Sequence, residues 1–432
     1  MTHTQFTPRY RNYVLFLLTV TYCLNFIDRQ LMTILLEPIK NEFGVSDTAM
    51  GFLTGFAFAM FYATLGVPVA RLADNWSRRN VLAWSLAIWS GLTAMCGAAT
   101  TFGQMALLRI GVGVGEAGGT PPSHSLISDY FPPEKRSSAM SIHATGTQFG
   151  ILIGMFGGAL IADAYGWRMA FVVFGLPGIL LSLLIAKTVK EPAKDAVSTT
   201  AEGLISSVKS IWAIPSFGLI AVATALTALS GYGLGAWGPS FLIRVHGLTL
   251  VEAGLLLGLA GTFSGLFGAI LGGFLCDKLS KTDKRWQLWL PAIGALISVP
   301  LQAGFLLWPA ESQWLIGDFQ VPVAIVFMLF GGMFASFWIG PTYAAVQNLA
   351  PADKRTQASA LLLLVLNLIG MGLGPLFVGI LSDALIPAFG NYSLRYALVA
   401  SLGAVLLGSF LYAKAAGPYR KVILSREESA AM

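Results

Sequence analysis

Apolar stretches of roughly 20 residues recur along almost the whole chain and are separated by short polar segments. A helix of this length crosses the roughly 30 Å hydrocarbon core of a bilayer and satisfies its own backbone polar groups. The pattern predicts an all-α membrane protein with twelve transmembrane helices. The expected spans are 13–38, 48–73, 79–99, 103–129, 137–162, 168–187, 214–243, 250–276, 288–308, 322–347, 355–383 and 393–415.

One long polar segment, residues 188–212, divides this pattern into six spans on either side. It contains Lys190, Glu191, Pro192 and a Ser-Thr-Thr run, a composition typical of a solvated linker. We therefore expect an N-terminal six-helix bundle over residues 1–187 and a cytoplasmic linker over 188–212. A C-terminal six-helix bundle with a cytoplasmic tail is expected over 213–432.

Composition agrees with a membrane protein. Hydrophobic residues make up 55% of the chain and charged residues only 11%, whereas soluble domains carry roughly 25% charge. The first apolar stretch contains charged residues and no small-residue cleavage site, so we expect it to be a retained span. The three cysteines lie inside predicted spans, which argues against a disulfide framework.

The distribution of Lys and Arg predicts the orientation. Of the 27 basic residues, 21 fall at the termini, in the even-to-odd loops or at adjoining helix ends, and two lie within spans. The opposite side carries only Lys40, Arg168, Arg244 and Arg395. By the positive-inside rule both termini are cytoplasmic. The short loops favour a bacterial inner membrane, and the absence of a dense basic tract argues against a nucleic-acid partner.

The two halves repeat each other. Residues 70–78, after span two, and 273–281, after span eight, place an acid, a serine and a base at the same offsets. A second repeated segment occurs at residues 132–139, after span four, and at 351–358, after span ten. Duplicated six-helix halves are typical of secondary transporters, whose substrate site lies between the halves near the midplane.

The loop containing Asp74, Ser77, Arg78 and Arg79 resembles the signature of the major facilitator superfamily between spans two and three. Ala70 and Ser77 stand where that family usually has glycine, although the charged part is intact. The resemblance covers essentially the whole chain. It implies the major facilitator fold, with two pseudo-symmetric six-helix bundles.

Three further strings resemble the Spinster family within that superfamily: residues 25–30 in span one, 109–117 in span four and 130–136 after it. This resemblance implies proton-linked export or redistribution of lipids that have a polar head and a single long chain. Lysophospholipids and sphingosine phosphates are such lipids.

Four charged residues, Asp28, Arg29, Arg109 and Glu116, lie well inside predicted spans. An unpaired charge at a helix centre costs roughly 2.5–3.5 kcal/mol on insertion scales, so these residues either form ion pairs that orient helices or serve a proton and substrate relay. Arg109 and Glu116 share a helix face but differ by about 10 Å in height, so we expect Asp28 to supply a partner between or beside them. Arg29 points about 100° away from Asp28, so it needs another partner or packs structurally.

These charges lead to a coupling hypothesis. Protonation of Glu116 or Asp28 would free Arg109 to hold an anionic headgroup, and deprotonation would release that group. We assign proton coupling to Asp28, Glu116 and Arg109. The expected substrate-binding residues are these three together with Arg29, Asn25, Phe334, Trp338 and Tyr343.

The second half carries no comparable mid-span charge, so the predicted cavity has one charged wall and one amphipathic wall. That asymmetry suits a molecule with a head and a tail. Ordinary packing remains the alternative for Phe334 and Trp338.

Cytoplasmic helix ends gather Asp74, Arg78, Asp129 and Arg136, and the family resemblance makes such residues a charge-pair gate on that side. Exposed pairs contribute only ~0–1 kcal/mol each, so the gate would bias a nearly balanced equilibrium. A solvated loop position is the alternative for Arg136.

Glycines recur at intervals of four in span five, at Gly146, Gly150, Gly154 and Gly158, and span eleven has a similar strip beginning at Gly370. Such strips allow two helices to approach closely. They serve either static packing or rocking of the two halves during alternating access.

Other sequence features do not indicate a cofactor, a metal site or a catalytic site. A GxGxxG string at residues 113–118 lies in a span without a preceding strand, and no Walker string occurs, so we expect no nucleotide cofactor. The four histidines lack metal-binding spacing. The chain offers no recognisable catalytic set and no sizeable soluble domain, which argues against an enzyme or a receptor.

The leading prediction is a monomeric, proton-coupled transporter of lysolipids or sphingosine-phosphate-like lipids. The alternative is an organic-anion or multidrug transporter of the same fold.

Overall fold

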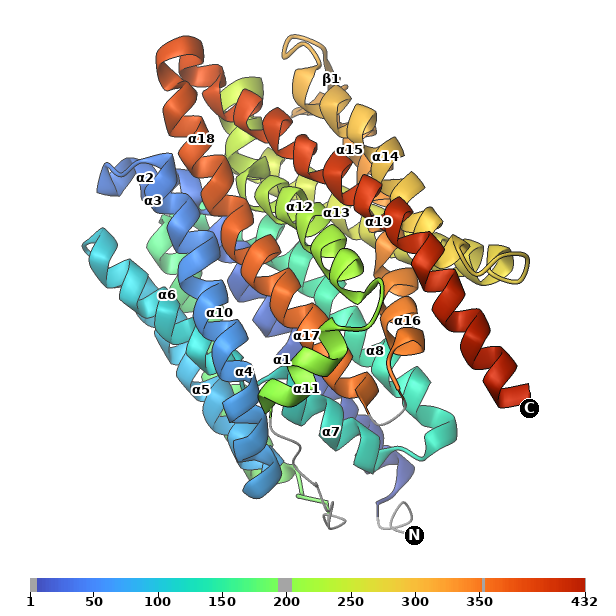
Figure 1. Cartoon of the computed structure of the whole chain (residues 1–432). Coiled ribbons are helices and arrows are strands. Elements are labelled where there is room, and N and C mark those ends of the chain that lie inside the picture. Colours follow the sequence, from blue (N-terminus) through green and yellow to red (C-terminus); the bar gives the residue numbers. More distant parts are fainter. Residues whose placement is uncertain (1–5, 193–203, 352–353, 432) are drawn as a thin grey trace. The chain divides into compact units, whose positions relative to one another are not determined.

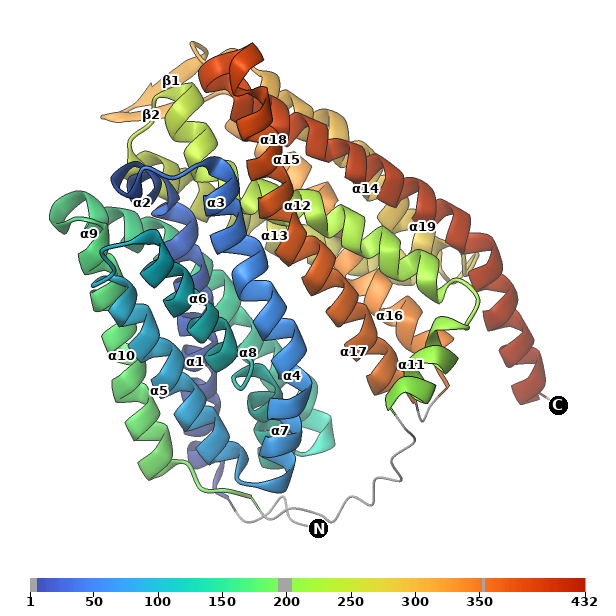
Figure 2. The same ribbon diagram turned by 60° about the vertical axis from the view of Figure 1, so that its left-hand side comes forward.

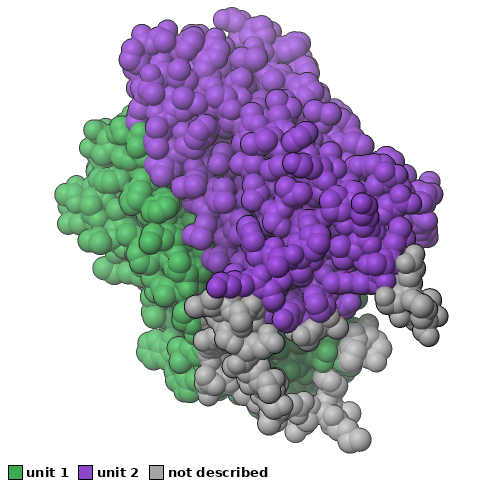
Figure 3. Space-filling view, in the orientation of Figure 1, with its two compact units in different colours: residues 1–197, 248–258 green, residues 198–247, 259–432 purple. Residues whose placement is uncertain are grey.

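The computed structural model describes residues 6–192, 204–351 and 354–431. Helices dominate this part of the chain (Figure 1, Figure 2). It forms two compact units, Met1–Val197 with Leu248–Gly258, and Ser198–Gly247 with Leu259–Met432 (Figure 3). We call them unit 1 and unit 2. The segment Leu248–Gly258 groups with unit 1, so the two units are not divided at a single point of the chain. The division into residues 1–187, 188–212 and 213–432 stays a prediction.

Besides the beginning of α13 (Leu250–Leu279), which it holds up to Gly258, unit 1 contains ten complete helices and two π-helical segments within its described residues. They are α1 (Pro8–Ile34), α2 (Leu36–Phe43), α3 (Asp47–Gly51), η1 (Phe52–Phe56), α4 (Ala57–Asn75), α5 (Arg78–Cys96), α6 (Phe102–Glu116), α7 (Thr120–Tyr130), α8 (Pro133–Leu152), η2 (Ile153–Gly157), α9 (Gly158–Tyr165) and α10 (Trp167–Thr188).

Unit 2 contains the remaining helices and a two-stranded hairpin. They are α11 (Leu204–Trp212), α12 (Phe217–His246), α13 (Leu250–Leu279, from Leu259 onward), α14 (Trp286–Leu307), β1 (Gln313–Ile316), β2 (Phe319–Pro322), α15 (Ile325–Ala335), η3 (Ser336–Trp338), α16 (Ile339–Leu349), α17 (Arg355–Val365), η5 (Leu366–Leu373), α18 (Gly374–Phe389), η6 (Gly390–Tyr392) and α19 (Ser393–Ala431).

Local sequence signals fix several helix ends. Ser77 caps α5 by accepting a bond from the Asn80 backbone N–H, and Thr101 caps α6 in the same way through Gln104. A side-chain oxygen there satisfies one of the N–H groups that the first turn leaves unpaired. Gly247 ends α12 in the left-handed conformation that glycine adopts without strain.

The helices match the predicted spans to within a few residues at most ends. By length and composition, nine stretches of the described residues can cross a membrane, and one of them, Gln357–Arg426, is long enough to hold two predicted spans. Neither α5 nor the broken pair α6 and α7 is among the nine. The count of twelve therefore stays a prediction.

Two segments outside the predicted spans form helices. The solvated linker predicted over 188–212 contains a helix, α11, whose Ile211 is buried in the core of unit 2 because that part of the linker has an apolar face. Residues 193–203 lie outside the described part of the chain. The last span, predicted to end at 415, continues as α19 to Ala431, with Tyr419 and Ile423 buried in the same core.

The glycine strips face helices of their own units. A Cβ on Gly150 would lie 2.6 Å from the Cys23 carbonyl oxygen of α1, and a Cβ on Gly370 would lie 2.7 Å from Ala228 Cβ of α12. Glycine removes the side chain that would separate these backbones. This geometry favours close packing within each unit, and it holds α1 firmly against α8 and η2.

Candidate functional site

An ion pair joins Asp28 of α1 to Arg109 of α6, as the sequence predicts. Arg109 Nη1 donates to Asp28 Oδ2 at 2.8 Å. Both residues are buried, with 3% and 2% of their surface exposed. Because a charge without a partner is very unfavourable at that depth, each of these groups depends on the other.

A second ion pair joins the neighbouring residue, Arg29, to Glu116. Arg29 Nε and Nη2 both lie 2.9 Å from Glu116 Oε2. The Glu116 side chain is fully buried, whereas that of Arg29 is 19% exposed. Of the two possibilities that the sequence left open, Arg29 has another charged partner. The hypothesis that protonated Glu116 frees Arg109 also changes, since Glu116 binds Arg29.

These four residues form one charge cluster, because Glu116 also interacts electrostatically with Asp28 and Arg109. Aromatic rings enclose the cations. The ring of Phe58 lies 5.0 Å from the Arg29 guanidinium and 5.7 Å from that of Arg109, and Tyr62 lies 4.7 Å from Arg29. Such contacts stabilise a guanidinium without neutralising it.

The cluster keeps unused hydrogen-bonding capacity. Among the residues that the structure describes, Arg109 Nε, Glu116 Oε1 and Asn25 Oδ1 are buried without a hydrogen-bond partner. Buried polar atoms are normally paired, so these three atoms leave capacity for further hydrogen bonds beside the ion pairs. Asn25 lies on α1 about one turn before Asp28.

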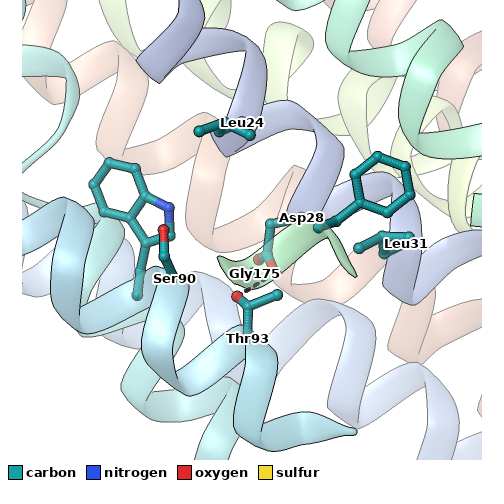
Figure 4. A pocket seen from close by; sticks show the side chains of 8 residues that line it. Leu24, Asp28, Leu31, Ser90, Thr93 and Gly175 are labelled. Atoms are coloured by element: carbon teal, nitrogen blue, oxygen red, sulfur yellow. Dashed lines mark hydrogen bonds between the residues drawn. The ribbon is translucent and has the colours of Figure 1, made fainter. Parts of the chain in front are cut away.

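Thr93 and a small pocket complete the surroundings of Asp28. Thr93 Oγ1 donates to Asp28 Oδ1 at 2.5 Å, so each carboxylate oxygen has its own donor. The pocket lies between α1, α5 and α10 and has room for about one water molecule (Figure 4). Its lining residues are Leu24, Asp28, Leu31, Trp89, Ser90, Thr93, Phe174 and Gly175. The sequence analysis missed Ser90 and Thr93, although two hydroxyls three residues apart in an apolar helix are a recognisable signal.

Helix irregularities occupy corresponding positions in the two units. Span four breaks over residues 117–119 directly after Glu116, and span ten changes to a 3₁₀ turn at η3. Spans five and eleven both contain π-helical segments, η2 and η5. In secondary transporters, interrupted helices at matching positions of repeated halves line the substrate site.

The predicted aromatic residues of unit 2 surround η3. The rings of Phe334 and Phe337 pack in a tilted arrangement at a centroid distance of 5.2 Å, and Trp338 lies 6.4 Å from the ring of Tyr343. Trp338 and Tyr343 pack on the main core of unit 2, whereas Phe334 packs on a smaller cluster with Phe337. Packing within unit 2 therefore buries part of the surface of Phe334, Trp338 and Tyr343.

Arg78 makes several contacts among the residues that were predicted to form the cytoplasmic gate. Its guanidinium pairs with Asp129, as expected, and also donates to Ser125 Oγ at 3.0 Å. Arg136 instead donates to the carbonyl of Phe131, five residues earlier, at 3.1 Å. The side chain of Asp74 lies outside the described part of the structure.

Glu191, which was predicted to lie in the solvated linker, also contacts Arg78. Its carboxylate accepts bonds from Ser77 Oγ at 2.8 Å, Arg78 Nε at 3.0 Å and the Arg79 backbone N–H at 2.9 Å. Partial burial alone would raise the pKa of Glu191, but these donors outweigh it and lower the pKa below its ordinary value. An anion at the start of α5 is favoured because the backbone N–H groups there are free to donate.

The comparisons with known proteins settle the family. The model of the Major Facilitator Superfamily matches residues 18–375. The chain belongs to the major facilitator superfamily. This member is 34% identical to an MFS-type efflux pump of Mycolicibacterium smegmatis, over 93% of this chain and 91% of that protein. It is 26% identical to a probable galactarate/D-glucarate transporter of Bacillus subtilis, over 97% and 94% of the two chains.

A solved structure identifies this member of the superfamily as Spinster-like. The crystal structure of a bacterial homolog to the human lysosomal transporter Spinster, in an inward-facing and unoccupied conformation, superposes with a TM-score of 0.85. The two chains are 30% identical, and the match covers 96% of this chain and 99% of that one. The chain is thus a Spinster-like membrane transporter.

Proposed function

We propose that this Spinster-like protein is a proton-coupled secondary transporter of lysolipids or sphingosine-phosphate-like lipids that works by alternating access. The observation that carries the proposal is the pairing of Asp28 with Arg109 directly beside Arg29 with Glu116. Two carboxylates, which can be protonated, and two guanidiniums, which can bind an anion, lie together on the helices α1 and α6.

Each carboxylate controls one cation. Protonation of Asp28 removes the charge that holds Arg109, and protonation of Glu116 does the same for Arg29. Guanidinium groups bind phosphate oxygens in a bidentate manner, so a released arginine suits a phosphate headgroup. When the carboxylates lose their protons they take the arginines back, and the headgroup leaves.

The apolar surroundings suit a single acyl chain. Phe58 and Tyr62 lie beside the cations, and the proposed substrate contacts in unit 2 are Phe334, Trp338 and Tyr343. A site that encloses a charged head next to aromatic rings favours an amphipathic ligand over a sugar.

The proposal also includes a cytoplasmic gate, an oligomeric state and a location in the cell. Asp74, Arg78, Asp129 and Arg136 form the cytoplasmic gate, and Glu191 joins them. The protein acts as a monomer in a bacterial inner membrane, with both termini in the cytoplasm.

A second candidate is an organic-anion or multidrug transporter. The relatives favour it, because one is named an efflux pump and another a galactarate/D-glucarate transporter. Dicarboxylic sugar acids carry the charge that Arg29 and Arg109 would bind.

Flux in sealed proteoliposomes tests the proposal. A pH gradient is imposed, and the movement of lysophospholipid and sphingosine phosphate is followed, with glucarate and short carboxylates as competitors. The lipid proposal expects gradient-driven lipid flux that other long-chain lysolipids inhibit and glucarate does not. Inhibition by glucarate, or glucarate flux without lipid flux, would favour the second candidate.

Two variants separate the substrate question from the mechanism. At matched protein incorporation, Glu116→Gln and Arg109→Ala should both abolish gradient-driven lipid flux. Glu311→Gln is the control, because Glu311 is an exposed carboxylate in a loop of unit 2. If the wild type moves lipid and both site variants remain gradient-dependent, the lipid assignment stands and the coupling mechanism is wrong.

A further inference from the structure

The connection between α14 and α15 is a β-hairpin with one entirely apolar face. Its strands pair Gln313 with Pro322, Trp314 with Val321, Leu315 with Gln320 and Ile316 with Phe319. Side chains alternate between the two faces of a strand, so directly paired residues share a face. One face therefore carries Trp314, Ile316, Phe319 and Val321, which we call the hairpin's apolar face.

This apolar face is exposed within the described structure. Trp314 is 47% exposed, Ile316 62% and Phe319 40%, and Leu315 on the other face is 74% exposed. Exposed apolar side chains gathered on one small element mark an interaction surface. An isolated two-stranded hairpin is only marginally stable in water, so this one needs something to cover its face.

The hairpin is held in a fixed position at its base. Gln313 Nε2 donates to the carbonyls of His246 and Ala310, both at 3.0 Å, and the backbone N–H of Val323 donates to the Ser312 carbonyl at 3.0 Å. A two-residue turn at Gly317 and Asp318 closes the other end, where Gly317 adopts a positive φ of 63°. The apolar face is therefore presented by an ordered element.

An aromatic group surrounds the same end of unit 2. Trp308, which precedes the hairpin, packs against the ring of Phe327 of α15 at a centroid distance of 4.9 Å, and its carbonyl accepts a bond from Arg395 of α19. Phe389 and Tyr396, 42% and 36% exposed, pack against each other at a ring-centroid distance of 4.3 Å near the turn between α18 and α19. Figure 2 shows the hairpin and this turn at the end of unit 2 opposite to α11. Aromatic side chains gather in this way where a membrane protein meets the headgroup region.

Exposed apolar side chains continue from the hairpin onto the two helices that it connects, α14 and α15. Leu307 at the end of α14 and Val326 and Phe330 of α15 are 47%, 39% and 47% exposed on spans of an integral membrane protein. Residues 308–324 contain no Lys or Arg, and their two acids are Glu311 and Asp318, outside the strands. The apolar face thus carries no charge that would oppose contact with lipid.

We propose that the hairpin's apolar face lies in the interfacial region of the adjacent leaflet, which is the outer leaflet in the predicted topology. Trp314, Ile316, Phe319 and Val321 contact lipid there, while Gln320 and the turn at Asp318 face water. The hairpin then fixes the depth of the α14–α15 pair in the bilayer. This inference is independent of the transported substrate.

Depth measurements on the full chain in lipid nanodiscs test the proposal. Single cysteines replace Ile316 on the apolar face and Gln320 on the other face, in a background where Cys23, Cys96 and Cys276 are serine or alanine, and carry an environment-sensitive fluorophore. Quenching is compared between aqueous iodide and lipids with a nitroxide near the headgroup end of the acyl chain.

The label at Ile316→Cys should be quenched at least threefold more strongly by the lipid nitroxide than by iodide, and the label at Gln320→Cys should show the reverse order. Equal iodide quenching at both positions would overturn the proposal, because the face would then be in water. Protection of Ile316→Cys from both quenchers would also overturn it, because protein would then cover the face. Asp318→Cys provides the water-exposed reference, and gel filtration of each labelled variant verifies its fold.

Discussion

Asp28 and Arg29 are consecutive residues of α1, yet each pairs with a different charge on α6, Asp28 with Arg109 and Arg29 with Glu116. Consecutive helical residues point about 100° apart, and the two partners lie seven residues apart, which is close to two turns. The two helices thus join through two separate ion pairs of opposite polarity. Such an arrangement sets the register and the rotation of α1 against α6.

Removing one partner of the deeper pair should destabilise the protein. We expect Asp28→Asn to lower the free energy of unfolding by about 3–5 kcal/mol, because it leaves Arg109 buried without a counter-charge. Thermal unfolding in detergent measures the change. The double variant Asp28→Asn with Arg109→Gln should recover part of the loss, and a strictly additive double-variant effect would show that the two groups do not interact.

The hydroxyl of Thr93 should contribute more to the stability of the protein than its methyl group. Thr93→Val removes the donor to Asp28 Oδ1 but keeps the shape, and a hydrogen bond to a charged group contributes about 1.5–3 kcal/mol. Thr93→Ser keeps the hydroxyl and serves as the matched control. The Val variant should therefore unfold at a clearly lower temperature than the Ser variant. Equal unfolding temperatures would exclude a stabilising role for this bond.

Glu191 should stabilise the start of α5 in a pH-dependent way. Its pKa is lower in the folded protein than its ordinary value of 4.5, since Arg79, Ser77 and Arg78 donate to the carboxylate against the effect of burial. The stabilisation is therefore fully present above pH 4.5 and is lost as the pH falls through the folded pKa.

A comparison of the wild type with Glu191→Gln at several pH values checks the direction of this pH dependence. The variant should be less stable than the wild type by about 1–2 kcal/mol near pH 7, the magnitude of a lost helix cap. The difference should stay constant down to about pH 5 and shrink below it. A difference that grows on acidification would contradict the assigned direction of the pKa shift.

The glycine strip gives a test with an internal control. A Cβ at Gly150 would contact the Cys23 carbonyl and Phe26 Cβ, both at 2.6 Å, so we expect Gly150→Ala to destabilise by about 1–3 kcal/mol. Gly91 lies in α5, and a Cβ added there would meet nothing within 4 Å, so Gly91→Ala should be neutral or stabilising by up to about 1 kcal/mol. Similar effects at both sites would mean that close packing does not explain the strip.

The membrane-spanning helices could be predicted from the sequence because they have a strong apolar signal. The Asp28–Arg109 pair could be predicted because buried charges need partners. The partner of Arg29 could not be derived, since the rotation of α1 against α6 depends on packing at positions such as Gly150 and Gly154. Glu191 was missed because its donors lie more than a hundred residues away in the chain. The break after Glu116 was also missed, although two glycines and two prolines follow it.

Substrate-driven proton movement tests the central claim most directly. Lysophospholipid is added to sealed proteoliposomes without an imposed gradient, and an enclosed dye records the interior pH for the wild type, Asp28→Asn, Glu116→Gln and the control Glu311→Gln. The account predicts that the wild type and Glu311→Gln change the interior pH in proportion to the lipid moved. It also predicts that Asp28→Asn and Glu116→Gln lose that change. Unaltered proton movement per lipid in both site variants would contradict the account.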